Sequence, residues 1–339
     1  MNRPDFLARI LQYYADTHFK HFISVGDASD PDSVRENKDI IERLKGCLNI
    51  RYYSCQGLTV AKSIRLINED VATPYATFTA DDDFIVTRSI EKCIAFLEAN
   101  LNYTGAHGHG VVFTLRTSDV HGPMNSVGYY RMGELNEDFA SERLKTLLSN
   151  YFVPLFSIHR LPAWKKMWQH VAPLTNVPLE GEMLPCCMAA IQGKIKKLDC
   201  LYLFRQDHQK RNHPDRFDWI TMPTWAPSYQ LLRRFVTEEL AEKDRLEVKR
   251  ADEILKMAFW TYLSRGLTKQ YHRRYQNNGF GKKIKTAIKS TVFGTYLRSA
   301  WVGVKNNFSS EGALLIGLEN PSSPYYDDFQ EVCKTVSAS

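Results

Sequence analysis

The sequence predicts an α/β protein with a mostly parallel sheet, helices on both faces of that sheet, and a mainly helical C-terminal region. Two observations lead to this prediction. Short apolar strands alternate with amphipathic helices up to about residue 205, an order that is typical of a parallel or mostly parallel sheet. Beyond that point the alternation stops, and apolar residues recur at helical spacing instead. We therefore expect two domains, residues 1–205 and 206–339.

The composition sets limits on the class of protein. The chain has 339 residues, 24% of them charged, and a formal net charge of +6. No apolar run approaches the length that spans a bilayer, and the start has no apolar signal region. The seven cysteines show no Cys-x-x-Cys spacing, which argues against a zinc site or a disulfide framework. We therefore expect reduced thiols and a cytoplasmic location.

Six elements are predicted ahead of a run of three aspartates. They are, in order, a helix at 2–14, a strand at 21–25, a helix at 30–46, a strand at 50–53, a helix at 58–67 and a strand at 75–79. Proline in the first turn marks the start of the first two helices, and Gly46 ends the second. The last strand follows Pro74 and is rich in aromatic and β-branched residues.

Asp81, Asp82 and Asp83 are expected at the carboxyl end of the strand at 75–79. Ligands of open α/β sheets bind there, and Mg²⁺ binds carboxylates together with substrate phosphates. Alternate residues of an extended segment point the same way, so Asp81 and Asp83 can converge on one ligand. The alternative is an acidic turn before a helix that begins at Thr87. Asp27 similarly ends the strand at 21–25, and its alternative is a plain turn residue.

The pattern is weaker after a strand predicted at 111–115. Residues 116–150 are polar and glycine-containing, with one short helix at 139–148, and are expected to cover a site as a loop. His107 and His109 have the i, i+2 spacing of two residues that share a strand face and a ligand, but the glycines that flank them favour partly exposed loop residues. The remaining predicted elements are an extended piece at 151–159, a helix at 161–170, a helix that runs through 189–191 and a strand at 198–204.

Glu180 and Glu182 stand where a loop leads into the helix through 189–191. A carboxylate near a helix N-terminus is stabilised by the helix dipole, which is one explanation for both residues. The functional alternative is a general base, which must reach the proton that it removes.

Several stretches together resemble the successive landmarks of family 2 glycosyltransferases. They are Asn-Arg-Pro-Asp-Phe-Leu at 2–7, Ile-Ser-Val-Gly-Asp-Ala-Ser at 23–29 and Thr-Ala-Asp-Asp-Asp-Phe at 79–84. With Gly-Lys-Ile-Lys-Lys-Leu at 193–198, the chain resembles a bacterial subgroup of that family over about residues 2–205. The resemblance implies a GT-A fold and transfer of a sugar from a nucleotide-sugar donor to an acceptor hydroxyl, usually with inversion. The acceptor would be a glycan or a lipid-linked molecule, as in envelope or surface glycan synthesis.

The resemblance also implies a metal site. Asp81 and Asp82 would bind the nucleotide sugar, and Asp83, together with Asp81, would hold Mn²⁺ or Mg²⁺. A divalent cation there would neutralise the charge that develops on the leaving nucleoside diphosphate. His208 would be a further metal ligand in this interpretation, whereas its polar surroundings in the sequence predict a solvated loop.

Three further roles follow from the resemblance. Asp27 would face the nucleobase, and Lys62 of the third helix would approach the nucleotide, although lysine lacks the bidentate geometry of arginine. The general base maps onto Glu180-Gly181-Glu182, and Glu182 is favoured because it stands directly at the start of the helix.

One departure concerns the start of the sequence. Members of the family usually carry a strand ahead of the Asn-Arg-Pro stretch, and the given sequence begins with Met1 at that point. Either the true start lies upstream of Met1, or the first strand is missing from 1–205. That strand normally helps to build the floor of the nucleotide site, so its absence would weaken donor binding.

The C-terminal region contains a long basic segment. Helices are predicted at 227–249 and 254–263, and no Asp or Glu occurs from Ile254 to Ser310, whereas Lys and Arg recur through 256–305. A basic amphipathic helix is typical of proteins that bind an anionic membrane surface, which would make the protein peripheral to the inner membrane. The alternative is a solvated basic face that packs its apolar side on the catalytic domain. Nucleic acid is not an expected partner, because no recognised binding motif accompanies the basic residues.

Two other functions remain open. A nucleotidyltransferase shares phosphate chemistry and an α/β sheet, but it would need a glycine-rich basic loop near the start, and the sequence has none there. A non-catalytic binding or scaffold protein derived from the same fold is favoured by the missing first strand and disfavoured by the three aspartates and Glu182.

Overall fold

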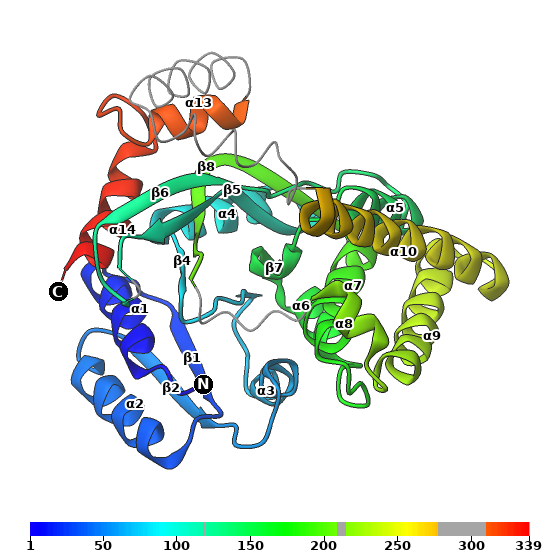
Figure 1. Ribbon diagram of the computed structural model, residues 1–339, viewed down its shortest axis with the longest axis horizontal. Coiled ribbons are helices and arrows are strands. Elements are labelled where there is room, and N and C mark those ends of the chain that lie inside the picture. Colours follow the sequence, from blue (N-terminus) through cyan, green and yellow to red (C-terminus); the bar gives the residue numbers. More distant parts are fainter. Residues whose placement is uncertain (118, 209–214, 277–309, 339) are drawn as a thin grey trace.

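The computed structural model describes residues 1–117, 119–208, 215–276 and 310–338 (Figure 1). Within these residues, all the strands precede residue 207 and every later element is a helix. The predicted α/β class with a mainly helical C-terminal region is thus confirmed.

The strands form two sheets. A two-stranded sheet contains β1 (Phe22–Asp27) and β2 (Asn49–Ser54), which run parallel. The larger, six-stranded sheet has the order β3-β7-β5-β8-β4, with β6 paired to β5. Its strands are β3 (Tyr75–Ala76), β4 (Asp83–Ile85), β5 (Tyr103–Leu115), β6 (Met124–Tyr130), β7 (Ile158–Arg160) and β8 (Lys194–Gln206). In the described residues, β1 pairs with β2 alone.

The pairing in these sheets is mixed, which corrects the prediction of a mostly parallel sheet. The pairs β1–β2 and β5–β8 are parallel, whereas β3–β7, β4–β8, β5–β6 and β5–β7 are antiparallel. Parallel neighbours need a long crossover connection, whereas antiparallel neighbours can follow one another directly. β6 follows β5 after a short connection within the segment that was expected to be a loop, and therefore returns along it.

β5 is much longer than the strand predicted at 111–115, because it includes the glycines that were interpreted as loop residues. A Cβ atom on Gly108 would lie 2.2 Å from the carbonyl oxygen of Cys200 in β8, so glycine permits the close approach of the two strands there. His107 is fully buried in β5, and the expectation that it is a partly exposed loop residue is wrong.

The first helices begin and end as the sequence predicts. α1 (Pro4–Asp16) and α2 (Pro31–Leu44) both have proline in the first turn. The Asp30 side chain caps α2 by accepting a hydrogen bond from the Ser33 N–H at 2.9 Å. Thr59 caps α3 (Val60–Ile67) in the same way.

The later helices form the rest of the molecule. They are α4 (Thr87–Ala99), α5 (Ala140–Ser149), the 3₁₀ turn η1 (Pro154–Phe156), α6 (Leu161–Trp168), the π-helical turn η2 (Leu179–Met183), α7 (Leu184–Gln192), α8 (Arg216–Thr221), α9 (Trp225–Asp244), α10 (Val248–Tyr271), the π-helical turn η3 (His272–Gln276), α13 (Ser310–Gly317) and α14 (Tyr326–Ser337). None of the helices in the described ranges is long and apolar enough to cross a membrane.

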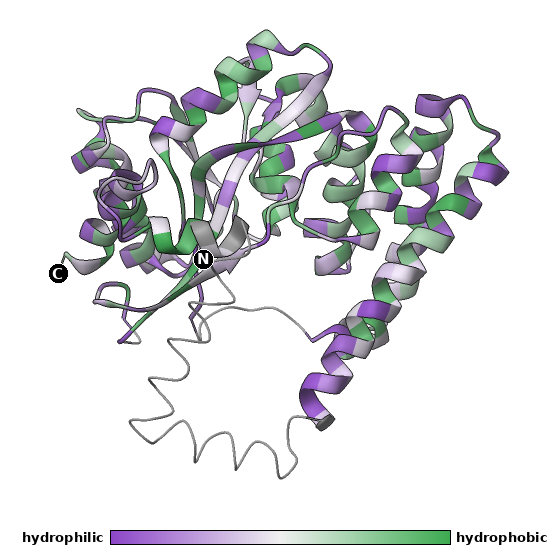
Figure 2. Cartoon of the chain, turned by 90° about the horizontal axis from the view of Figure 1, so that it is seen from above, coloured by the Kyte–Doolittle hydropathy of each residue, from purple (hydrophilic) through white to green (hydrophobic). Residues whose placement is uncertain are grey.

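Three apolar cores join these elements. One core links α5, α6 and α7 with α9 and α10, so the C-terminal region packs on the first 205 residues. A second joins α1 and α14 to β4, β5 and β8, and a third packs α4 against the same strands. Figure 2 shows the alternation of hydrophilic and hydrophobic residues along these helices that such packing requires. The boundary at residue 205 stays a prediction.

Candidate functional site

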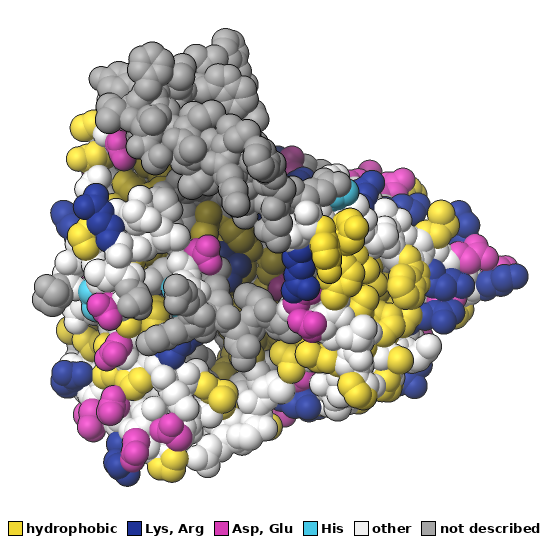
Figure 3. Space-filling model, viewed as in Figure 1, with side chains coloured by type: hydrophobic (Ala, Val, Ile, Leu, Met, Phe, Trp, Pro, Cys, Tyr) yellow, Lys and Arg dark blue, Asp and Glu magenta, His cyan; other side chains and the backbone are white. Residues whose placement is uncertain are grey.

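A large cleft of ≈ 2400 Å³ lies between the two sheets and the helical region. Figure 3 shows a hollow at the centre of the face that is viewed there. The cleft is lined by all of β1, by residues 70–82, and by parts of α3, η2, α8, α10 and η3. Ligand pockets typically have volumes of roughly 300–1,000 Å³, so this cleft has room for two substrates side by side.

Asp81 and Asp82 line this cleft, and Arg3 binds both of them. The Arg3 guanidinium donates two hydrogen bonds to the Asp81 carboxylate, one of them from Nε at 3.1 Å, and its Nη1 lies 3.3 Å from Asp82 Oδ2. Burial raises the pKa of Asp81, and the charge of Arg3 partly opposes this rise. Asn2 holds Arg3 in place, because its N–H donates to Ser29 Oγ at 2.9 Å.

His208 contacts one carboxylate of this pair, that of Asp82. Its Nε2 lies 2.8 Å from Asp82 Oδ2, and its ring stacks on Phe6 of α1 with 5.1 Å between ring centroids. Only 10% of the His208 side chain is exposed, so the expectation of a solvated loop residue is wrong. Sequence reasoning missed the role of Arg3, although the residue belongs to the first landmark stretch of the family resemblance.

Asp83 lies in a different environment from the other two aspartates. It is the first residue of β4 and is fully buried, and Arg205 of β8 donates from Nε to its Oδ2 at 2.8 Å. β3 ends at Ala76, and the three aspartates lead into β4, which corrects the prediction that they lie directly at the carboxyl end of a strand. The predicted metal role of Asp83 stays a prediction, and Asp83 does not line the cleft.

Asp27 is held at the end of β1 and lines the cleft. Its carboxylate accepts hydrogen bonds from the Ser29 N–H at 2.9 Å, Asn37 Nδ2 at 2.9 Å and the Tyr52 hydroxyl at 3.1 Å. Burial alone would raise the pKa of Asp27, but these donors hold it below the ordinary value. The carboxylate is thus fixed and ionised, as a group that recognises a ligand N–H would need to be.

Glu180 and Lys62 are turned towards each other. Glu180 is buried, accepts a hydrogen bond from the Thr59 hydroxyl, and lies 3.9 Å from the Lys62 ammonium nitrogen. Burial raises the pKa of Glu180. Neither residue lines the cleft, and their predicted catalytic and donor-binding roles stay predictions. The contact instead ties η2 to α3.

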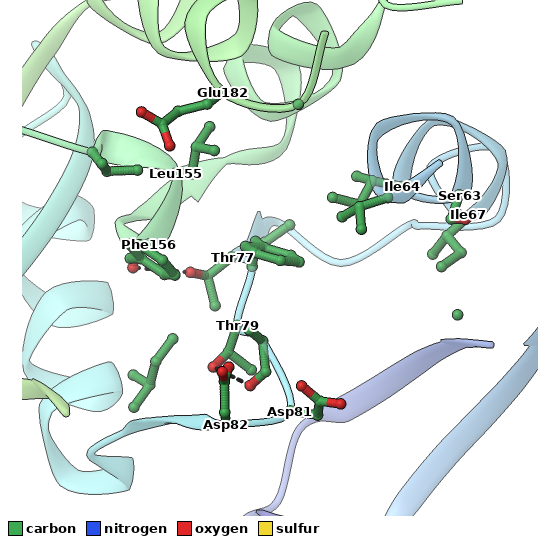
Figure 4. Close-up of a pocket in the computed structure, with 18 of the residues that line it drawn as sticks. Ser63, Ile64, Ile67, Thr77, Thr79, Asp81, Asp82, Leu155, Phe156 and Glu182 are labelled. Atoms are coloured by element: carbon green, nitrogen blue, oxygen red, sulfur yellow. Dashed lines mark hydrogen bonds between the residues drawn. The ribbon is translucent and has the colours of Figure 1, made fainter. Parts of the chain in front are cut away.

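Glu182 is the carboxylate that reaches the cleft from the opposite side. It lies in η2, and Figure 4 shows it across the pocket from Asp81 and Asp82, with Thr77 and Phe156 between them. The Tyr151 hydroxyl donates to its Oε1 at 2.8 Å, and the Tyr151 ring packs on Tyr262 of α10 at 4.7 Å between centroids. π-Helical turns occur frequently at functional sites, and this one presents Glu182 while it turns Glu180 away.

The predicted basic segment is described only in part. Residues 256–276 belong to α10 and η3, and several of their basic side chains line the cleft. Residues 277–305 lie outside the described residues. The prediction of a membrane-binding helix there stays a prediction.

The cleft provides two carboxylate ligands for a divalent metal. In the described ranges, no three His, Cys, Asp or Glu side chains come together as a group that could hold a metal ion. Mg²⁺, however, often uses only one or two carboxylates together with substrate phosphates and water. Asp81 and Asp82 provide two adjacent carboxylates in the cleft, and the Arg3 guanidinium shows that they accept a cation.

Comparisons with known proteins are distant. No family model matches the sequence, and no curated protein matches it. Among solved structures, the chain is similar to TarS from S. aureus: TarS 1–349 in complex with UDP-GlcNAc has a TM-score of 0.49 at 15% identity, covering 84% of this chain and 77% of that one. The complex of TarS 1–349 with UDP has a TM-score of 0.47 at 15% identity, covering 91% of this chain and 77% of that one. A further crystal structure of TarS has a TM-score of 0.46 at 15% identity, covering 98% of this chain and 53% of that one. We assign no activity or ligand from likenesses this distant.

Proposed function

We propose that this protein is a glycosyltransferase that moves a sugar from a nucleoside-diphosphate sugar to an acceptor hydroxyl, with inversion and with the help of Mn²⁺ or Mg²⁺. One observation carries the proposal. A single cleft brings together Asp27, the pair Asp81–Asp82 and Glu182, which come from widely separated parts of the chain. These are the residues to which the family resemblance assigns nucleobase, donor and base roles.

The side of the cleft formed by β1 and residues 79–82 would bind the donor. Asp27 is ionised and fixed, and is therefore suited to accept hydrogen bonds from a nucleobase. Asp81 and Asp82 would hold the metal, which when bound supplies Lewis-acid stabilisation of the leaving diphosphate. Arg3, already in contact with both carboxylates, can offer its guanidinium to a phosphate oxygen, because guanidinium groups bind phosphate in bidentate fashion.

The opposite side would activate the acceptor. Glu182 takes the proton from the acceptor hydroxyl as that oxygen forms the new bond to the anomeric carbon, while the bond to the nucleoside diphosphate breaks on the other face of the sugar. The hydrogen bond from Tyr151 at 2.8 Å fixes the orientation of the carboxylate and leaves Oε2 to accept the proton. Attack from the face opposite the leaving group inverts the configuration.

The first test is calorimetric titration with UDP, GDP, ADP, CDP and dTDP, each with and without Mn²⁺. We expect one nucleotide to bind with metal-dependent affinity, and Asp81→Asn to weaken that metal dependence. Asp32→Asn, at an exposed position of α2, is the control that removes one carboxylate elsewhere. A folded protein that binds none of the nucleotides would contradict the proposal and favour the non-catalytic scaffold.

The second test addresses the base. We expect Glu182→Gln to keep nucleotide binding and to lower the rate of sugar transfer by about 10²–10⁴, the usual contribution of a general base. Glu180→Gln is the matched control two residues away, since Glu180 is turned towards Thr59 and Lys62. Equal rate losses in the two variants, or loss of nucleotide binding in Glu182→Gln, would show that Glu182 acts in folding.

Attachment to the inner membrane is a separate part of the proposal. It rests on the basic residues of 277–305, whose net positive charge would be attracted to anionic lipid at about 1 kcal/mol per Lys or Arg near the surface. Flotation with anionic liposomes tests it, and recovery of the protein in the bottom fraction would exclude this attachment.

A further inference from the structure

The wall of the cleft beside Glu182 is strongly basic. Five basic side chains from α8, α10 and η3 line it, and we call them the basic wall: Arg216, Arg265, Lys269, Arg273 and Arg274. Three of them recur every four residues, which places them on one side of the helix at steps of about 6 Å along its axis. Figure 2 shows that the last turns before the grey trace are mainly hydrophilic.

Part of this charge is not neutralised within the protein. Arg274 pairs with Asp215, and Arg265 donates to the carbonyl oxygen of Ser149 at 2.7 Å. Lys269 and Arg273 are exposed and have neither an ion pair nor a hydrogen bond with any residue of the described ranges. Positive charge that lines a cleft attracts anions, because the low-dielectric walls focus the field.

Part of the basic wall is linked to the proposed base through two tyrosines. Tyr262 of α10 packs on Tyr151, and Tyr151 in turn holds Glu182. Arg216 lies over the same Tyr262 ring, 5.8 Å from its centroid. The carboxylates assigned to the donor are instead bound by Arg3, at the start of α1. Tyr262, Lys269 and Arg273 follow one another along α10 and η3 and all line the cleft, so a molecule that presents its hydroxyl to Glu182 can extend along the basic wall.

We propose that the acceptor is anionic: a glycan that carries phosphate or carboxylate groups, which Lys269 and Arg273 bind while its hydroxyl meets Glu182. The proposal rests on the proposed function, since it needs Glu182 to act on an acceptor. The size of the cleft fits it, because ≈ 2400 Å³ exceeds what one nucleotide sugar requires. The same chemistry gives the described part of the basic segment a role other than membrane binding.

The test compares two double variants of equal charge change. Lys269→Gln/Arg273→Gln neutralises the basic wall. Lys249→Gln/Arg250→Gln neutralises two exposed residues at the other end of α10, which do not line the cleft. Binding of dextran sulfate, with neutral dextran of the same length as the reference, is measured across a salt series, and nucleotide binding is measured in parallel.

We expect the basic-wall variant to bind dextran sulfate at least about fivefold more weakly than the control variant and with a shallower dependence on salt, because fewer counterions are displaced. Nucleotide affinity should be the same in both. Equal binding of dextran sulfate by the two variants would overturn the proposal.

Three further results would assign the basic wall to another ligand and would also overturn the proposal. Loss of nucleotide binding in the basic-wall variant alone would assign the wall to the donor. If a single-stranded oligonucleotide binds more tightly than dextran sulfate and the basic-wall variant weakens that binding, the wall binds nucleic acid. The same result with phosphatidylglycerol vesicles would show that the wall binds a membrane. A different result, in which neither the wild type nor any variant binds a nucleotide, would overturn the proposed function. The acceptor role would then fall with it.

Discussion

The two sides of the cleft differ in whether their charged side chains have partners within the protein. On the donor side, Arg3 neutralises Asp81 and Asp82, and three hydrogen-bond donors satisfy Asp27. On the basic wall, Lys269 and Arg273 have no partner among the residues that the structure describes. Internal partners fix the position of a charge before any ligand arrives, whereas exposed charges are held by the ligand itself.

This difference predicts that substitutions on the two sides will change the free energy of unfolding by different amounts. Charges with buried partners should contribute to the stability of the fold, because removal of one partner leaves the other uncompensated. Exposed charges should contribute to binding and not to stability. The following substitutions test this distinction, in order of decreasing effect.

Asp83→Asn should have the largest effect on stability. Asp83 is fully buried against Arg205, and removal of one member of a buried ion pair costs about 3–5 kcal/mol. The free energy of unfolding from urea denaturation measures this, with Asp32→Asn, at an exposed ion pair, as the control. A change as small as that of the control would show that the pair of Asp83 and Arg205 does not stabilise the fold.

Asp27→Asn should reduce the free energy of unfolding by about 1–3 kcal/mol at neutral pH, since the amide would turn an N–H₂ group towards donors that need an acceptor. The folded-state pKa of Asp27 is lowered, so its contribution is present above the unfolded-state pKa of about 3.9 and is lost as the pH falls through the folded-state value. The difference between wild type and variant should therefore shrink below about pH 4. A difference that does not change with pH would show that the charge of Asp27 is unimportant.

Arg3→Gln should change metal binding and leave the fold intact. Removal of the guanidinium releases both carboxylates, so the affinity for Mn²⁺ without nucleotide should rise about tenfold, or ~1.4 kcal/mol. Because Arg3 opposes the rise in the pKa of Asp81, the loss of Mn²⁺ binding on acidification should occur at a higher pH in the variant. Arg35→Gln, which also leaves a carboxylate partner behind, is the control in a manganese titration followed by electron paramagnetic resonance. Weaker Mn²⁺ binding in Arg3→Gln would contradict this account.

Lys269→Gln/Arg273→Gln should have the smallest effect on stability. Both side chains are exposed, and surface substitutions of this kind usually change the free energy of unfolding by less than about 0.5 kcal/mol. A thermal melt checks this, and a clearly destabilised variant would show that the basic wall has a structural function.

The sequence predicted most elements because local signals specify them. Pro4 and Asp30 mark helix starts that the structure contains, and the apolar stripes show which faces are buried. It did not predict β4 or the full length of β5, since a strand of three residues has too little periodicity to detect and the glycines of β5 are required by contacts with β8.

The candidate site shows the same limit. Asp27, Asp81, Asp82 and Glu182 were selected from motifs, and all of them line the cleft. The separation of Asp83 from its two neighbours depends on Arg205, which lies 122 positions away in the sequence. The bond between His208 and Asp82 spans 126 positions, and no local pattern reports such a contact.

The pairing of β1 has a consequence for mutagenesis. All six residues of β1 line the cleft, and the strand pairs with β2 alone among the described residues. Peptide groups along its other edge pair with no described strand, and they are the same whichever side chain is present. An alanine scan of 22–27 would therefore miss their contribution. Proline substitution, or replacement of single amides by esters, removes the backbone N–H groups one at a time. These changes would reveal whether a ligand forms hydrogen bonds with the backbone of β1.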